Sequence, residues 1–111
     1  MNVYDTANKL AQEIKESEEI KNYRKYKELV NSNSDIKEKI KKFENLRYEI
    51  QLSAMQGLEA NKEKEKELQE TYTELLSKEN VKEYFDAEFK FNILLADVNK
   101  IIGEAVKDII E

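Results

Sequence analysis

Residues 81–111 read VKEYFDAEFKFNILLADVNKIIGEAVKDIIE, and no proline interrupts them. When they are numbered in heptads from Val81, mostly apolar residues occupy the first and fourth positions. These residues are Val81, Glu88, Leu95, Ile102 and Ile109, and Tyr84, Phe91, Val98 and Ala105. Such spacing is typical of a helix that packs lengthwise on other helices. The pattern therefore predicts one long helix over residues 81–110.

Apolar residues also lie beside this seam, and charged residues occupy only a narrow strip of the helix. The flanking apolar residues are Phe85, Phe89, Leu94, Ala96, Ile101, Val106 and Ile110. A helix that is apolar around so much of its circumference has to be covered on more than one side. Because a chain of 111 residues has few other helices for this, we expect a second copy of the chain to cover it. A homodimer is the simplest arrangement, and a higher oligomer stays open.

The composition is that of a helical protein with long solvated faces. Proline is absent, glycine occurs only twice, and 39% of the residues are charged. The hydrophobic share of 40% is too large and too periodic for a disordered chain. We expect an all-α multihelical bundle of about five helices, folded as a single domain over residues 1–111.

The residue inventory excludes several classes of function. The net charge of −5 disfavours a surface that coats DNA or RNA. Without cysteine or histidine, the chain lacks the usual nucleophile pairs and the commonest metal ligands. We therefore expect no catalytic residues, no cofactor and no metal. Two alternatives remain: an accessory protein that contacts RNA directly through residues near Tyr23 and Tyr26, and a carboxylate metal site.

Nothing in the sequence predicts a membrane segment. No apolar run approaches the length needed to cross a bilayer, and the first residues lack the basic and apolar regions of a signal peptide. A cytoplasmic location is the expectation.

Four further helices are expected before the long one, over residues 3–16, 18–31, 35–54 and 62–77. Asn2 and Ser17 are the expected caps of the first two helices, Asp35 with Glu38 of the third, and Asn80 of the last. Whether the first two helices are separate, and whether the third continues through Gly57, stays open at this stage.

Two charged segments are expected to be solvated. Lysines surround the start of the third helix, at positions 37, 39, 41 and 42, where we expect them to balance Glu38 and Glu44. Residues 62–67 alternate lysine and glutamate without an apolar residue, so we expect them to project into water or to fray.

Polar residues on the long helix are candidates for setting the register of a helix–helix interface. Glu88, Asn92, Asn99 and Gly103 share one face of the rod. They either border the seam in contact with water or determine register and partner choice, as a buried Asn does in coiled coils. The expected interface consists of Tyr84, Glu88, Phe91, Asn92, Leu95, Val98, Asn99, Ile102, Gly103 and Ile109.

Several short motifs resemble a known bacterial family. They are VYDTANKLA at residues 3–11, SEE at 17–19, YFDAE at 84–88, FNILLADV at 91–98 and IIG at 101–103. In this order and spacing they are similar to the YlbF/YmcA-type family of small helical proteins, and most of all to its YheA-like branch.

The resemblance implies a multihelical bundle that dimerises through long helices in the cytoplasm of a Firmicute-type bacterium. It also implies a non-enzymatic regulator that acts with protein partners, as the better-known relatives do in competence, sporulation and biofilm development. Those relatives are linked to RNA processing through their partners. Any cysteine-ligated cofactor of a relative cannot form in this chain, because the chain has no cysteine.

Overall fold

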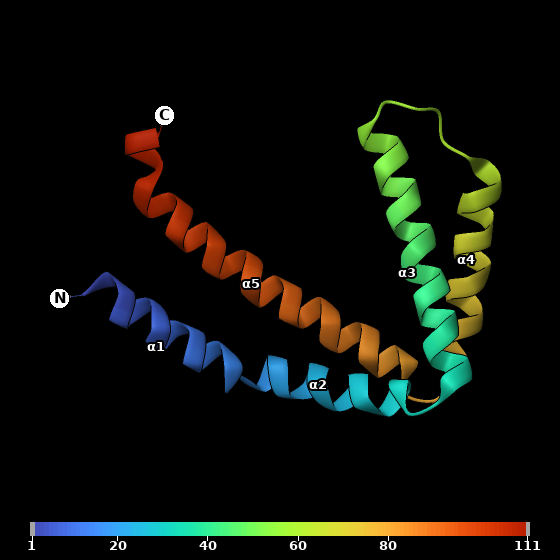
Figure 1. Ribbon diagram of the computed structural model, residues 1–111, viewed down its shortest axis with the longest axis horizontal. Helices are drawn as coiled ribbons and strands as arrows, with labels where there is room; N and C mark the ends of the chain where they lie inside the picture. Colours follow the sequence, from blue (N-terminus) through green and yellow to red (C-terminus); the bar gives the residue numbers. More distant parts are fainter. Residues whose placement is uncertain (1, 111) are drawn as a thin grey trace. The chain divides into compact units, whose positions relative to one another are not determined.

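The computed structural model describes residues 2–110, and that part of the chain contains helices and no strands. The helices are α1 (Val3–Lys15), α2 (Glu18–Asn31), α3 (Ser34–Met55), α4 (Lys62–Leu76) and α5 (Val81–Ile110), as Figure 1 shows. The expected all-α fold with a long C-terminal helix is confirmed. The expected helix ends differ from the observed ones by at most one residue.

The chain divides into two compact units. The first contains α1, α2 up to Tyr26, and α5 from Glu83 onward. The second comprises Lys27–Lys82, and therefore holds the whole of α3 and α4. The single domain expected over residues 1–111 stays a prediction.

Side-chain caps separate the first helices. The Asn2 side-chain oxygen accepts a hydrogen bond of 2.8 Å from the Tyr4 backbone N–H at the start of α1. The Ser17 hydroxyl accepts one of 3.3 Å from the Ile20 N–H at the start of α2. Both satisfy donors that a helix start leaves unpaired. Thus α1 and α2 are separate helices, with Glu16 and Ser17 between them.

Two expected caps are replaced by other arrangements. The cap of α3 is Asn33, whose side-chain oxygen accepts from the backbone N–H groups of Asp35 and Ile36. Asp35 lies in the first helical turn, where a carboxylate interacts favourably with the helix dipole. Asn80 has a φ of 68°, the left-handed conformation that Asn tolerates well, and not the extended backbone of an N-cap residue.

Helix α3 ends at Met55 because Gly57 reverses the chain. Gly57 has a φ of 73°, and its N–H donates to the Ala54 carbonyl at 3.1 Å. The Leu58 N–H donates to the Ser53 carbonyl at 3.0 Å. These two bonds form a Schellman motif, which needs a residue that adopts the left-handed conformation without strain. The helix therefore does not continue through Gly57.

The second unit is built on the hairpin of α3 and α4, which pack directly on each other. Ile36, Ile40, Phe43 and Leu46 form the buried stripe of α3. The rings of Phe43 and Tyr72 stack with their centroids 5.5 Å apart. The side chains of Val30, Leu75 and Val81 are completely buried.

Ion pairs link the two helices of this hairpin along their exposed side. Lys42 pairs with Glu67 at 3.2 Å and Lys64 with Glu49 at 3.0 Å, while Lys39 pairs with Glu74. The hydrogen bond and positive charge of Lys39 hold the pKa of the Glu74 carboxyl below its usual value. Lys39 and Lys42 therefore pair with carboxylates of α4, and not with Glu38 and Glu44 of their own helix.

The segment 62–67 projects into water, as expected, because Lys64 is its one partly covered residue and the other five are exposed. It forms the first turns of α4, begun by Asn61, whose side chain accepts from the Lys64 N–H at 3.1 Å. Its charges serve contacts with α3, because Lys64 and Glu67 are the residues that reach across to that helix. A segment without apolar residues is held here by a cap and by ion pairs.

The motif that ends α3 makes a direct prediction. A methyl group at Gly57 would meet no atom within 4 Å, so Gly57→Ala tests backbone strain alone. We expect a loss of about 1 kcal/mol in the free energy of unfolding, measured by urea denaturation. Gly57→Asn is the matched control and should lose clearly less, because Asn adopts the left-handed conformation more readily. Equal losses in the two variants would contradict this explanation.

Candidate interaction surface

The side chain of Tyr23 on α2 packs against the first half of α5. Its ring lies 5.8 Å from that of Tyr84 and stacks on that of Phe91 with the centroids 5.5 Å apart. The Tyr84 ring in turn meets Phe85 at 5.5 Å. Aromatic pairs at these separations contribute roughly 0.5–1.5 kcal/mol beyond the area they bury. This cluster covers one face of α5 from within the chain.

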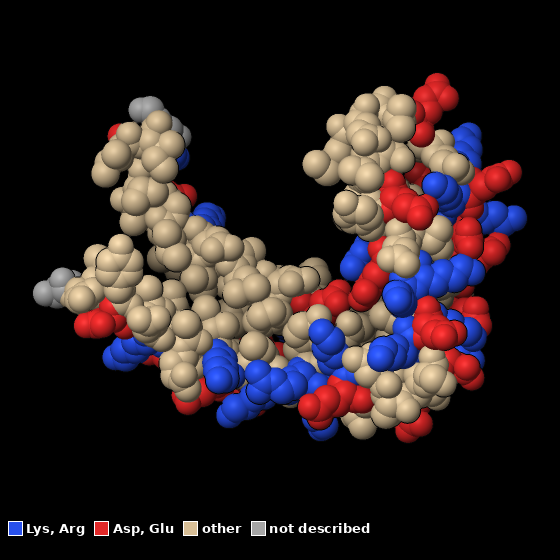
Figure 2. Space-filling model, in the orientation of Figure 1, with Lys and Arg blue, Asp and Glu red and all other residues tan. Residues whose placement is uncertain are grey.

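Most of α5 beyond this cluster is uncovered. In the described chain every residue from Ile101 to Ile110 is exposed, including five large aliphatic side chains. These are Ile101, Ile102, Val106, Ile109 and Ile110, and their exposed fractions range from 38% to 83%. Figure 2 shows the same region as a nearly continuous surface of uncharged residues along α5. Contiguous apolar surface of this kind marks an interaction site.

Helix α1 also leaves most of its apolar residues exposed. No residue of α1 is buried, and only Leu10 and Ile14 of its apolar stripe are partly covered. Val3 and Tyr4 remain about four-fifths exposed. The first unit thus presents apolar residues on both α1 and the C-terminal half of α5.

The total surface area agrees with this picture. The chain exposes 8993 Å² in total. Two separate compact proteins, each of half its mass, would expose only about 7,700 Å² together. The excess of about 1,300 Å² is larger than the roughly 800 Å² that each partner buries in a standard interface.

The residues expected to form an interface fall into three groups. Tyr84 is buried, and with Phe91 it contacts Tyr23 of the same chain. Four more are partly or fully exposed along one side of α5: Glu88, Leu95, Ile102 and Ile109. Asn92, Asn99 and Gly103 are exposed, and Val98 is partly covered. The structure thus brings most of them to the surface and uses the first aromatic pair internally.

Sequence reasoning missed the role of Tyr23. It considered Tyr23 in the alternative of a direct RNA contact, whereas the ring packs against two aromatic residues of α5. Its partners Tyr84 and Phe91 lie about 60 residues away in the sequence, so no local pattern connects them. The only available signal was the shared aromatic character of the three positions.

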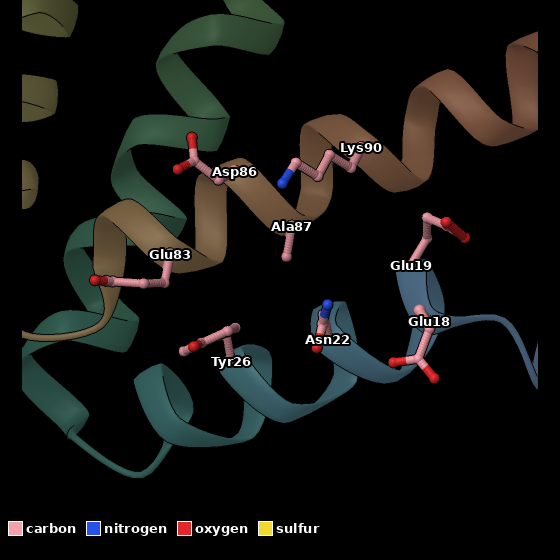
Figure 3. A pocket seen from close by; sticks show the side chains of 8 residues that line it. All are labelled: Glu18, Glu19, Asn22, Tyr26, Glu83, Asp86, Ala87 and Lys90. Carbon is pink, nitrogen blue, oxygen red and sulfur yellow. The ribbon is translucent and has the colours of Figure 1, made fainter.

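A groove of about 430 Å³ lies between α2 and α5 in the first unit (Figure 3). Charged side chains border it from both helices: Glu18, Glu19, Glu83, Asp86 and Lys90. Asn22, Tyr26 and Ala87 complete its lining. Four carboxylates against one ammonium group disfavour phosphate and nucleic acid at this place.

Metal-binding groups, displaced pKa values and membrane-spanning helices are three further features that bear on function in the described residues. Residues 2–110 hold no group of three or more Asp and Glu side chains arranged to bind a metal ion. The lowered pKa of the Glu74 carboxyl has a structural cause, the hydrogen bond and charge of Lys39, and does not indicate a reactive group. None of the described helices is both long enough and apolar enough to cross a membrane.

These features define a small all-helical protein whose prominent surface is an apolar helix face. The chain belongs to the YlbF/YmcA family, described as control of the competence regulator ComK, whose family model matches residues 3–107. The resemblance identified from the sequence motifs is thereby confirmed, and it connects the chain to a regulatory family.

Relatives and a solved structure agree with this assignment. A UPF0342 protein of Desulfitobacterium hafniense is 36% identical over 99% of this chain and 89% of its own length. One from Symbiobacterium thermophilum is 35% identical over 94% of this chain and 93% of its own. A DUF964 protein from Bacillus stearothermophilus has the same fold, with a TM-score of 0.81 at 16% identity, covering 96% of this chain and 93% of its own.

The aromatic cluster makes a prediction about the first unit. Tyr23→Ala removes both ring contacts with α5, and we expect it to lower the free energy of unfolding by about 2 kcal/mol. Tyr48→Ala is the matched control, because Tyr48 is 65% exposed, and it should change the value by less than about 0.5 kcal/mol. Chemical denaturation followed by circular dichroism measures both, and equal effects would contradict the anchoring role of Tyr23.

Proposed function

We propose that this protein is a non-enzymatic regulatory module of the bacterial cytoplasm that forms a homodimer through α5. The dimer then offers its remaining surface to a protein partner. Membership of a family linked to control of a competence regulator supports a regulatory role. The observation that carries the proposal is the exposed apolar length of α5.

The energetics favour self-association. Complete burial of an Ile or Val side chain contributes roughly 1.5–3 kcal/mol. The five aliphatic residues between Ile101 and Ile110 are on average about two-thirds exposed, so covering them in both chains contributes on the order of 10–20 kcal/mol. Association costs roughly 4–15 kcal/mol in lost freedom of motion. The apolar face of two chains is thus large enough for a stable dimer.

A second copy of the chain is the best-supported partner for the uncovered face of α5, because two identical faces can pack about a two-fold axis. Every copy of the chain carries the same uncovered face, and two-fold homodimers are the commonest assemblies of soluble proteins. The acidic groove of the first unit and the charged hairpin of the second remain outside this face. They are available to a different protein in the assembled dimer.

The proposal predicts the mass in solution. Light scattering after size exclusion should give twice the chain mass of 13.1 kDa at micromolar concentration. Leu95→Glu places a charge beside the uncovered face and should give the single chain mass, because an unpaired charge is costly to bury.

The control is Lys82→Glu, on the exposed polar side of α5, which should keep the doubled mass. Far-ultraviolet circular dichroism verifies that both variants remain helical. A wild-type protein with a single chain mass across this concentration range would overturn the proposal.

A further inference from the structure

Helix α5 carries a second heptad seam, different from the one numbered from Val81. Its central members follow each other at alternating steps of three and four residues. They are Phe89, Asn92, Ala96, Asn99, Gly103 and Val106, and all are exposed in the single chain. Phe85 and Ile110 continue the same spacing at the two ends. We call these eight positions the second seam.

The second seam lies on a different face of α5 from the one its own chain covers. Tyr84 and Phe91, which contact Tyr23, are not members of it. Open space adjoins the seam at Gly103, where an added methyl group would meet no atom within 4 Å. The six central positions of this face, from Phe89 to Val106, are therefore accessible to another helix.

We propose that the second seams of two copies pack on each other in antiparallel orientation. The two-fold axis passes α5 midway between residues 97 and 98. This inference rests on the proposed homodimer and specifies its geometry. Of the five exposed aliphatic residues, Val106 and Ile110 lie in the second seam, Ile102 and Ile109 on one of its flanks, and Ile101 stays outside the contact. It follows from two properties of the seam: the sizes of the residues that meet and the character of the residues beside them.

The side chains of the second seam complement each other in size only when the two helices are antiparallel. With the axis at this place, Ala96 meets Asn99 of the second copy, and Asn92 meets Gly103. Each central layer then pairs an amide side chain with a small residue. In a parallel pair each residue would meet its own counterpart in the second copy. The layer of two Asn99 residues would then hold two amide side chains, and the next layer, of two Gly103 residues, would hold none. Well-packed helix pairs avoid such alternation of gaps and crowding.

The central amides also find partners in this arrangement. The two Asn99 residues lie three residues apart along the axis, which is about 4.5 Å at a rise of 1.5 Å per residue. Their side-chain amides reach each other across the two-fold axis, and each can both donate and accept a hydrogen bond. A buried polar pair of this kind fixes register in coiled coils.

The flanks of the seam are self-complementary in part, since this register also places Glu88 near Ile109 of the second copy and Ile93 near Lys100. In an antiparallel pair the same flank of each helix meets its counterpart. On one flank Leu95 meets Ile102 of the second copy, which buries two apolar pairs. On the other flank Asp86 lies near Lys107 of the second copy, which gives two pairs of opposite charge. A parallel pair would instead place Leu95 near Lys100 and Ile102 near Lys107.

Spin labels distinguish the two orientations directly. The chain has no cysteine, so single labels can be placed by Asp97→Cys and Asp108→Cys, both on the exposed polar strip. In the antiparallel dimer the two labels at position 97 are offset along the axis by about 2 Å, and those at position 108 by about 32 Å. Pulsed dipolar spectroscopy should therefore give a much longer distance for position 108.

Each outcome of this experiment has a definite meaning. Nearly equal distances at the two positions indicate a parallel dimer and overturn the inference while leaving the homodimer intact. Absence of dipolar coupling in both variants, with a single chain mass by light scattering, overturns the homodimer itself. A longer distance at position 97 than at position 108 also overturns the inference.

A matched pair of substitutions tests which face is used. Ala96→Glu places a charge in the second seam, whereas Ala105→Glu places it in the seam numbered from Val81. Both positions are exposed in the single chain, so neither should disturb its folding. Ala96→Glu should raise the dissociation constant at least about 100-fold and Ala105→Glu less than about 10-fold, measured by analytical ultracentrifugation. The reverse order would overturn the choice of face.

Discussion

Removal of apolar surface from water decides the organisation of the first unit. Helix α5 is 30 residues long, and apolar side chains occupy more than one of its faces. Tyr23 contributes the ring that covers Tyr84 and Phe91, and this contact secures the first half of the helix. The second half has no equivalent cover within the described chain. A long helix is thus stabilised in one part by its own chain and in the other, according to our proposal, by a second copy.

The second unit follows a different principle, because α3 buries its apolar stripe. Ile36, Ile40, Phe43 and Leu46 are buried, and ion pairs join α3 to α4 along the exposed side. Exposed ion pairs contribute little individually, so the apolar stripe of α3 carries most of the stability of this hairpin. The second unit thus buries the apolar stripe of α3, whereas the first unit leaves apolar residues of α1 and α5 exposed. This contrast agrees with a protein whose first unit is completed by assembly.

The sequence predicts the helices well because each is marked by local signals. Apolar periodicity and residues such as Asn2 and Ser17 define helix ends within a few neighbouring positions. Local signals were less decisive where neighbouring candidates compete, as at Asn33 and Asp35, since either residue type can cap a helix. They also failed to assign the lysines of α3, because Lys39 and Lys42 pair with carboxylates distant in sequence. The candidate interface was harder to predict, since two heptad seams share α5. The contacts of Tyr23 show which of the two seams the same chain covers.

Hydrogen exchange at the amides of residues 101–110 tests the central claim most directly. A terminal helical segment with no burial is only marginally stable in water. If a second copy covers this segment, its protection should rise with protein concentration, while that of the buried stripe of α3 stays constant. Rapid exchange of residues 101–110 at every concentration, including those well above micromolar, would contradict the account.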